Sequence, residues 1–321
     1  MTTLQPTPSA TPASAVDAPA GLLRVGVDIG GTRTKVVAVR DGVVLARFLR
    51  PTPRDVAVTV GPLVADVLAS VLSTEHLPAT DTASGVDRVG VVVPGIVDEE
   101  HQRAVWSANL GWRDLDVAAA LAGHVAVPVL LGHDVRAGLL GEHLLGAAAG
   151  VDDVLFVPLG TGLAAALMTA GRVVRGSEWT GELGHVRVVP DGPECGCGRF
   201  GCLEAVAGAT AVGRRWREAG REGDARTVSA AVEAGDPLAA SIWTAAVEAL
   251  ADAFAPVVAT AGTRLVLVGG GMAQAGATLL DPLRAALAER LPMPDGVAVA
   301  ASGLGEWSGA VGAAHLDLGT G

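Results

Sequence analysis

Residues 22–49, LLRVGVDIGGTRTKVVAVRDGVVLARFL, decide how the chain begins to fold. Three runs rich in valine and leucine are separated by two turn signals, Gly30-Gly31-Thr32 and Asp41-Gly42. The pattern predicts an antiparallel meander of three strands, at residues 23–28, 34–39 and 43–49. Because these strands form hairpins and do not cross over a helix, the opening is not that of a dinucleotide-binding βαβ fold.

Helices and strands alternate after the meander. The predicted elements, in chain order, are a helix at 55–72, a strand at 89–93 that ends at Pro94-Gly95, a loop with Trp106, Asn109 and Trp112, a helix at 115–123 and a strand at 127–131. The order β-β-β-α-β-α-β predicts an α/β lobe.

The second half of the chain repeats this order more weakly, which indicates an internal duplication. Its predicted elements are strands at 153–159, 163–168 and 172–174, a mainly helical region at 206–261 with a break at 222–226, a strand at 264–268, a helix at 275–290, a strand at 297–301 and a helix at 306–316. We expect the last helix to return to the first lobe. The predicted domains are a disordered tail at 1–21, a small α/β domain at 22–136 plus about 302–321, and a large α/β domain at 137–301 with the cysteine segment described below.

Each predicted lobe has a glycine turn after its first strand, and these turns are candidates for nucleotide binding. In the first turn Asp28 ends the strand, and glycine lets the backbone come close to a phosphate. Asp28 can hold Mg²⁺ directly or through water, and the single lysine of the chain lies nearby. A plain hairpin turn is the alternative, and the spacing matches neither a P-loop nor a dinucleotide motif. The candidate nucleotide-binding residues are Asp28, Gly30, Gly31, Thr32, Lys35, Gly160, Thr161, Gly162, Gly269 and Gly270.

Asp134 follows the strand at 127–131 and precedes an amphipathic helix at 137–145. A carboxylate at this edge of a sheet can accept a hydroxyl proton as phosphoryl transfer begins. Aspartate is also a good N-cap of a helix, and the local sequence does not separate the two roles.

Residues 181–204, GELGHVRVVPDGPECGCGRFGCLE, contain all three cysteines of the chain. His185, Cys195, Cys197 and Cys202 supply one imidazole and three thiolates, which is a ligand set for a structural Zn²⁺. The alternative is three free thiols in a reducing compartment beside an ordinary loop histidine. A disulfide framework is disfavoured by the odd number of cysteines. Glu182 and Glu204 flank the segment, so a metal would also fix two carboxylates.

Composition excludes several classes of protein. Half of the 321 residues are hydrophobic and the net charge is −11, without a basic stripe, so we expect no nucleic-acid binding. Residues 1–21 lack Lys and Arg and are not a signal peptide, and no apolar run is long enough for a membrane span. We expect a cytoplasmic protein that does not bind membranes.

Together these motifs resemble the ROK family of sugar kinases and repressors. The resemblance rests on residues 28–35, Pro94-Gly95, Ser107-Ala108-Asn109-Leu110 with Trp112, Asp134, Gly160-Thr161-Gly162, the GELGH motif at 181–185 and the CGCGRFGCLE motif at 195–204. It covers the chain from about residue 22 to residue 318. It implies an actin-like ATPase (ribonuclease H-like) fold with two α/β lobes around a central cleft.

The resemblance also implies roles for single residues. Asp134 would be the catalytic base on a sugar hydroxyl, and structural zinc would organise the sugar site without activating water. His185 would give one ring nitrogen to zinc and the other to sugar. The expected sugar-binding residues are Gly95, Asn109, His133, Asp134, Glu182, His185 and Glu204. The family usually carries asparagine at the position of His133, and this departure concerns the identity of the hexose.

The expected function is phosphoryl transfer from ATP, with Mg²⁺, to the 6-hydroxyl of a hexose, with glucose first. Alternatives are N-acetylmannosamine, N-acetylglucosamine, mannose or fructose as the acceptor, polyphosphate as the donor, a sugar sensor without catalysis, and a sugar-responsive repressor. Only a short tail precedes Arg24, which disfavours the repressor. The family resemblance implies a homodimer or homotetramer.

Overall fold

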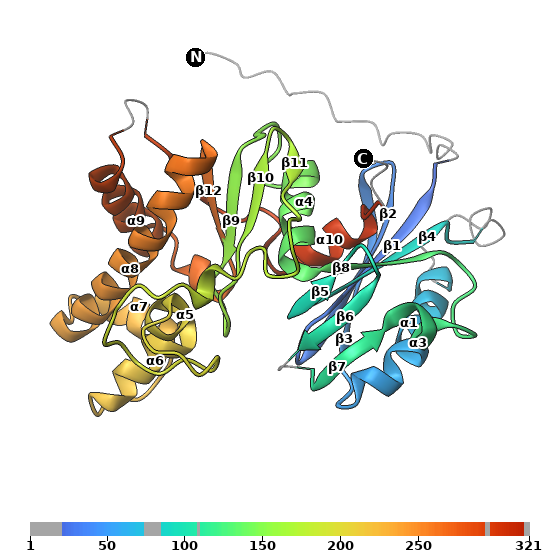
Figure 1. The fold of residues 1–321 in the computed structure, drawn as a ribbon, viewed down its shortest axis with the longest axis horizontal. Helices are drawn as coiled ribbons and strands as arrows, with labels where there is room; N and C mark the ends of the chain where they lie inside the picture. Colours follow the sequence, from blue (N-terminus) through green and yellow to red (C-terminus); the bar gives the residue numbers. More distant parts are fainter. Residues whose placement is uncertain (1–20, 74–84, 108–109, 293–295, 318–321) are drawn as a thin grey trace, which may run out of the picture.

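A computed structural model describes residues 21–73, 85–107, 110–292 and 296–317. Two mixed sheets lie in two lobes side by side, with α4 (Asp134–Leu145) and α10 (Ser308–Ala314) between them (Figure 1). The predicted α/β class is therefore confirmed.

The first sheet has the order β3-β2-β1-β4-β8. Its first three strands form the predicted antiparallel meander, and the next two are parallel to the first. Their bounds are β1 (Leu23–Ile29), β2 (Arg33–Arg40), β3 (Val43–Pro51), β4 (Arg88–Val93) and β8 (Val129–His133). The apolar side of α1 (Val56–Leu72) covers one face of this sheet, and its buried residues share a core with β1, β2 and β4.

The other face of the first sheet is covered by α10, as the sequence predicts for the last helix. The helix packs directly on β1 and β4 at two glycines. A Cβ at Gly26 would lie 1.9 Å from the Ala310 carbonyl oxygen, and one at Gly90 would lie 1.8 Å from that of Ala313. Val37 and Val39 of β2 are buried with the same helix. The first lobe is thus completed by the end of the chain.

The second sheet has the order β11-β10-β9-β12-β13. It repeats the first sheet, with an antiparallel meander followed by two parallel strands, so the predicted duplication is confirmed. The strands are β9 (Val154–Pro158), β10 (Ala166–Thr169), β11 (Arg172–Val173), β12 (Leu265–Gly269) and β13 (Ala298–Ala301). β10 begins three residues later than predicted, because Leu163 forms only an isolated bridge with Leu159 across the turn.

The helices of the second lobe form its main core, and they include α8, the longest helix that the structure describes. Their bounds are α5 (Leu203–Ala207), α6 (Ala209–Glu218), α7 (Ala225–Glu233), α8 (Pro237–Ala261) and α9 (Ala277–Arg290), with short 3₁₀ turns η1 (Leu183–His185), η2 (Gly271–Ala275) and η3 (Gly305–Trp307). α8 has the length and hydropathy of a membrane span, but 61% of its most apolar stretch is buried inside the protein. That burial is typical of a core helix.

The segment predicted as a loop around Trp106 is instead a three-stranded antiparallel sheet, so that prediction was wrong. Its strands are β5 (Ile96–Asp98), β6 (Arg103–Ser107) and β7 (Trp112–Asp116). The predicted helix at 115–123 is shortened to α3 (Val117–Leu121) because Asp116 ends β7 and its side chain caps the helix by accepting from Ala119 N–H. Asn109 lies outside the described residues.

Candidate active site and metal-binding cluster

Asp28 and Lys35 face each other across the β1–β2 pair. Lys35 Nζ donates to Asp28 Oδ2 at 2.9 Å, and both side chains are largely buried. Burial raises the pKa of Asp28 to about 6, although the lysine charge and hydrogen bond work in the opposite direction. Nearby Asp134 adds to the rise. The structure therefore brings Asp134 into the electrostatic environment of the first glycine turn.

The turn at Gly30, Gly31 and Thr32 is fixed by a residue that the sequence analysis missed. Thr52 follows β3, and its hydroxyl donates to the Gly30 carbonyl at 2.7 Å while its N–H donates to the Thr32 carbonyl at 3.0 Å. Gly30 N–H also donates to the Arg33 carbonyl. A single threonine beyond a strand gives no sequence signal for such a contact.

Asp134 is the first residue of α4, at the carboxyl end of β8. The helix therefore begins three residues before the predicted start. His133 is the N-cap, and its Nδ1 accepts from Val135 N–H at 3.2 Å. The Asp134 side chain is 28% exposed, and its Oδ1 accepts from the same N–H. Burial raises the pKa of Asp134, whereas the charges of Lys35 and Arg136 lower it.

His133 is 3% exposed, and its ring makes its hydrogen bonds with backbone atoms. It caps α4 through Val135 and also hydrogen-bonds to the backbone of Gly95. Burial and the charge of Arg136 lower its pKa to about 3, so the ring is neutral at ordinary pH. Gly95 has φ +107°, and a Cβ there would lie 2.2 Å from the Trp106 carbonyl oxygen, so this turn requires glycine.

Glu182 and His185 lie at the two ends of η1. His185 Nε2 is 3.6 Å from Glu182 Oε2, while Nδ1 faces Cys195 Sγ at 3.6 Å. Burial raises the pKa of Glu182, and the charges of Glu204 and Asp134 raise it further. The charges of carboxylates from two different helices, α4 and α5, thus act on Glu182.

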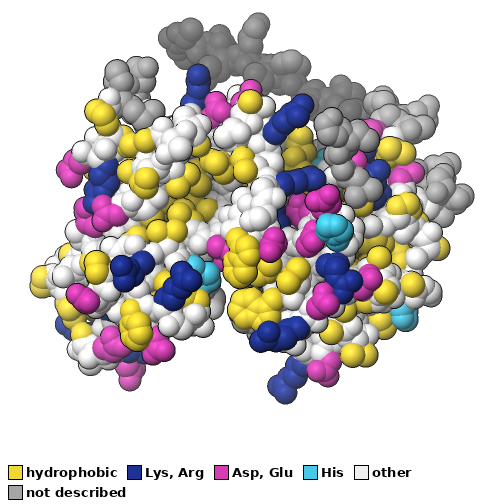
Figure 2. Space-filling view, viewed as in Figure 1, with side chains coloured by type: hydrophobic (Ala, Val, Ile, Leu, Met, Phe, Trp, Pro, Cys, Tyr) yellow, Lys and Arg dark blue, Asp and Glu magenta, His cyan; other side chains and the backbone are white. Residues whose placement is uncertain are grey.

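Glu204 belongs to α5 and reaches the second glycine turn. Its Oε2 accepts from Leu163 N–H at 2.7 Å, beside Gly162. Acidic side chains and histidines lie near the boundary between the lobes on this face (Figure 2).

The two glycine turns of the second lobe lie next to each other because β9 and β12 are paired. Gly160 N–H donates to the Gly162 carbonyl, and Thr161 accepts from the hydroxyl of Thr210 at 3.4 Å. Gly270 has φ +75°, and a Cβ there would lie 2.4 Å from the Leu159 carbonyl oxygen. Glycine is therefore required where the second turn meets the first.

A cavity of about 540 Å³ opens beside Gly271 in the second lobe, and sequence reasoning missed its lining. Met272 and Trp243 contribute apolar surface. Arg226 donates to Gln274 Oε1 at 3.2 Å, and both residues line the cavity. The lining residues that extend from the glycine turn are Ala209, Thr210, Gly271, Met272, Gln274 and Ala275. The run of glycines at 269–271 was the only local sequence signal for this cavity.

His185, Cys195, Cys197 and Cys202 come together as predicted, and their ligand atoms all lie within 4.8 Å of one another. Cys197 Sγ and Cys202 Sγ are 3.7 Å apart. A tetrahedral zinc with Zn–S bonds of about 2.3 Å would place its sulfur ligands about 3.8 Å apart. The donor set and its spacing therefore fit Zn²⁺.

Three comparisons with known proteins agree with these features. Residues 24–319 match the model of the ROK family. The glucokinase of Thermotoga maritima is 34% identical over 317 residues, which cover 91% of this chain and 96% of that protein.

Two solved structures have the same fold. The ROK hexokinase from Thermus thermophilus has a TM-score of 0.79 at 30% identity, over 91% of this chain and 97% of that one. The ROK family glucokinase from Streptomyces griseus, solved in complex with glucose and AMPPNP, has a TM-score of 0.73 at 29% identity, over 91% and 98%. The two-lobed architecture is the actin-like ATPase fold that the family resemblance implies. The chain belongs to the ROK family.

Proposed function

We propose that the chain is an ATP-dependent sugar kinase that phosphorylates the 6-hydroxyl of a hexose, with glucose as the preferred acceptor. One observation carries the assignment. Asp134 begins α4 at the carboxyl end of β8, in the same sheet as Asp28 and Lys35, and Arg136 beside it donates to the carbonyl of Thr180, two residues before Glu182. A carboxylate that stands between the lysine beside the first glycine turn and the acids Glu182 and Glu204 is placed to remove the proton of a sugar hydroxyl during phosphoryl transfer.

Asp134 is the proposed general base. It accepts the hydroxyl proton while its Oδ1 is held by Val135 N–H, and Lys35 and Arg136 help to keep it ionised. Positioned general bases contribute about 10²–10⁴-fold to rate. Asp28, at the end of β1, is the proposed Mg²⁺ ligand, since its Oδ1 is not used by Lys35. When bound, Mg²⁺ neutralises phosphate charge.

Glu182, His185 and Glu204 form the proposed sugar wall. Planar carboxylates can accept from two adjacent hydroxyls, which suits a polyol. His185 Nε2 points to Glu182 and away from the cysteines, so it is free to meet sugar while Nδ1 serves a metal. Asn109 stays a proposed contact, and Gly95 would admit the sugar at close range. For His133 we propose an indirect role through the Gly95 turn.

The nucleotide is proposed to lie against the three glycine turns. Its phosphates would meet the first turn, at Gly30, Gly31 and Thr32, and the turns at 160–162 and 269–270. The cavity beside Gly271 has the size and mixed lining that suit a base and ribose. Structural Zn²⁺ would be held by His185 and the three cysteines and would fix the orientation of the imidazole.

We further propose that the chain divides into a small domain, residues 22–136 plus about 302–321, and a large domain, residues 137–301. The proposed assembly is a homodimer or homotetramer. The expected cytoplasmic location stays a prediction.

The test is a coupled ADP-release assay with glucose, mannose, fructose, N-acetylglucosamine and N-acetylmannosamine. ATP and polyphosphate are compared as donors, and zinc is measured in the same preparation. The highest kcat/KM with ATP and glucose is expected. If the enzyme phosphorylates only a sugar other than glucose, that sugar is the acceptor. If it turns over glucose only with polyphosphate, polyphosphate is the donor. Sugar binding without turnover on any donor identifies a sensor and refutes the kinase.

A further inference from the structure

Glu99 joins His133 and Arg136, which lie one residue before and two residues after Asp134. It follows β5, and its Oε1 accepts from His133 N–H at 2.9 Å and from Arg136 Nε–H at 3.0 Å. The side chains of Glu99 and Arg136 are only 12% and 5% exposed. A single carboxylate oxygen therefore fixes the chain on both sides of the proposed base.

Arg136 uses its remaining donors on carbonyls from distant parts of the chain. Nη2 donates to Val97 of β5 at 3.3 Å, and Nη1 donates to Thr180 at 3.2 Å. Thr180 immediately precedes Gly181 and Glu182 in the proposed sugar wall. The Arg136 guanidinium at the start of α4 thus contacts both the β5–β7 sheet and the segment that leads into Glu182 of the wall.

The wall segment itself has little freedom next to this contact. Gly181 has φ +99°, and a Cβ there would lie 2.2 Å from the Ala165 carbonyl oxygen. Gly181 accepts from Ala165 N–H at 2.8 Å and from Leu183 N–H at 2.7 Å. A shift of the Thr180 carbonyl would therefore be passed on to Glu182.

Because Glu99 and Arg136 are buried, their ion pair can fix the geometry of the site more firmly than an exposed pair could. Exposed pairs contribute little, because water screens them and the side chains are free. A buried, planar guanidinium with fixed partners is held in one geometry, and losing one partner leaves a buried charge unpaired. Such a group is suited to keep reacting side chains within the roughly 0.5 Å that catalysis demands.

We propose that Glu99 and Arg136 are positioning residues that hold Asp134 and Glu182 at a fixed separation for phosphoryl transfer. Neither residue needs to touch the sugar, since each acts through backbone groups beside the reacting carboxylates. The proposal rests on the proposed kinase function.

The central test compares Arg136→Met with the wild type in steady-state kinetics. The variant keeps an unbranched apolar side chain in place of the arginine stem and removes all of the side-chain donors. We expect kcat to fall about 10- to 100-fold and the sugar KM to rise, because the base and the wall lose their common support. The KM for ATP should stay within about twofold, since among the described residues no hydrogen bond or ion pair joins Glu99 or Arg136 to the glycine turns.

Glu99 supplies the rescue experiment. Glu99→Ala removes the shared acceptor and should reproduce the losses of Arg136→Met. Glu99→Gln keeps a carbonyl oxygen with two acceptor sites, and its kcat should recover at least about tenfold over Glu99→Ala. The double variant Glu99→Ala/Arg136→Met should be about as slow as the slower single variant, as expected for residues that act as a unit.

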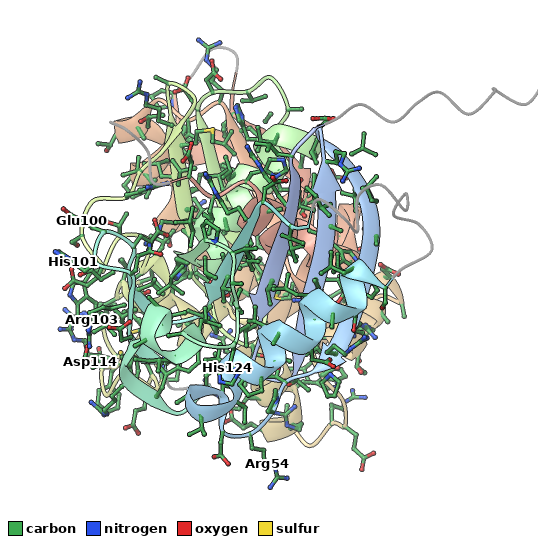
Figure 3. The ribbon with its side chains drawn as sticks, turned by 90° about the vertical axis from the view of Figure 1, so that its right-hand side faces the viewer. Arg54, Glu100, His101, Arg103, Asp114 and His124 are labelled. Carbon is green, nitrogen blue, oxygen red and sulfur yellow. The ribbon has the colours of Figure 1, made fainter. Side chains whose placement is uncertain are left out.

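Arg103→Ala is the matched control. Arg103 pairs with Asp114 in the same small sheet, but its side chain is 36% exposed, and both residues lie along the outer edge of the molecule (Figure 3). Its kinetics should equal those of the wild type.

The outcomes separate the two proposals. If the wild type turns over no sugar, the kinase assignment fails. If the wild type is active, three results overturn the positioning role: an unchanged sugar KM in both Arg136→Met and Glu99→Ala, an equal rise of both KM values, or losses that multiply in the double variant. A lower content of folded protein alone would reduce kcat and leave both KM values unchanged, so instability cannot imitate the expected split.

Discussion

Lys35 Nζ lies 2.9 Å from Asp28 Oδ2, so the single lysine of the chain neutralises the carboxylate directly opposite it in the β1–β2 pair. The pair is largely buried at the edge of the first glycine turn. Burial nevertheless dominates, and the pKa of Asp28 is raised to about 6. The ionisation of this carboxylate therefore depends on its only cationic partner within hydrogen-bond reach among the described residues.

Lys35→Met should shift the acid limb of the pH profile. Without the lysine charge the pKa of Asp28 rises above about 6, so more of the carboxyl is protonated near neutral pH. We expect kcat/KM for ATP to fall at pH 7 and its acid limb to move to higher pH, with a higher Mg²⁺ requirement. Profiles between about pH 5 and 9 measure the shift. A profile that superimposes on the wild type would exclude Lys35 from this role.

Asp28→Asn should stabilise the fold while it removes activity. The pKa of Asp28 is about 6 in the folded protein and near 3.8 when unfolded, so the folded state holds a proton that the unfolded chain has lost between these values. Stability from this group therefore falls as pH rises through the window and stays low above it. The variant should gain at most about 3 kcal/mol at pH 8, and less at pH 5. Urea unfolding at both pH values measures the difference, and an equal gain at both would contradict the ionisation argument.

Asp134→Asn should separate catalysis from sugar binding. An amide cannot take the hydroxyl proton, so kcat should fall about 10²–10⁴-fold, or roughly 3–5 kcal/mol. Sugar binding should survive, because Glu182, His185 and Glu204 are unchanged. Calorimetric titration with the preferred hexose checks this point. Unchanged turnover would remove Asp134 from the role of base.

Cys197→Ser tests the metal cluster. Removing one of four ligands should release zinc, lower the melting temperature and raise the sugar KM, since His185 loses the ion that fixes its Nδ1 side. Arg199→Ala, in the same segment, keeps all four ligands and should retain zinc and KM. Zinc content is measured by elemental analysis beside the kinetics. Loss of zinc with an unchanged sugar KM would mean that the metal only stabilises the segment.

Local signals predicted the parts of the fold that depend on neighbours in sequence. Turn residues such as Asp41-Gly42 set the meander, and the cysteine spacing at 195–202 predicted the cluster. The small sheet was missed because β5 is only three residues long and β7 carries Arg113 and Asp114, an outward-facing pattern that also suits a loop. Pairing of Arg103 with Asp114 across the strands compensates for that composition.

Contacts between distant segments had no sequence signal. Thr52 on the first turn and Glu99 beside Asp134 are polar residues in connections, and nothing near them in sequence indicates their partners. The cavity beside Gly271 likewise needs α6, α7 and η2 to pack together. The local sequence did not show whether Asp134 is a proton acceptor or the N-cap of the helix, and in the structure the N-cap is His133.

The packing of α10 on Gly26 and Gly90 has a consequence for synthesis on the ribosome. The strands of the first lobe emerge early, but the helix that covers their second face is made last. Until residue 314 has left the exit tunnel, Val37 and Val39 have no partner helix. The first lobe thus begins to form early and is completed late, and a chain cut short before α10 leaves an open sheet face for chaperones to protect.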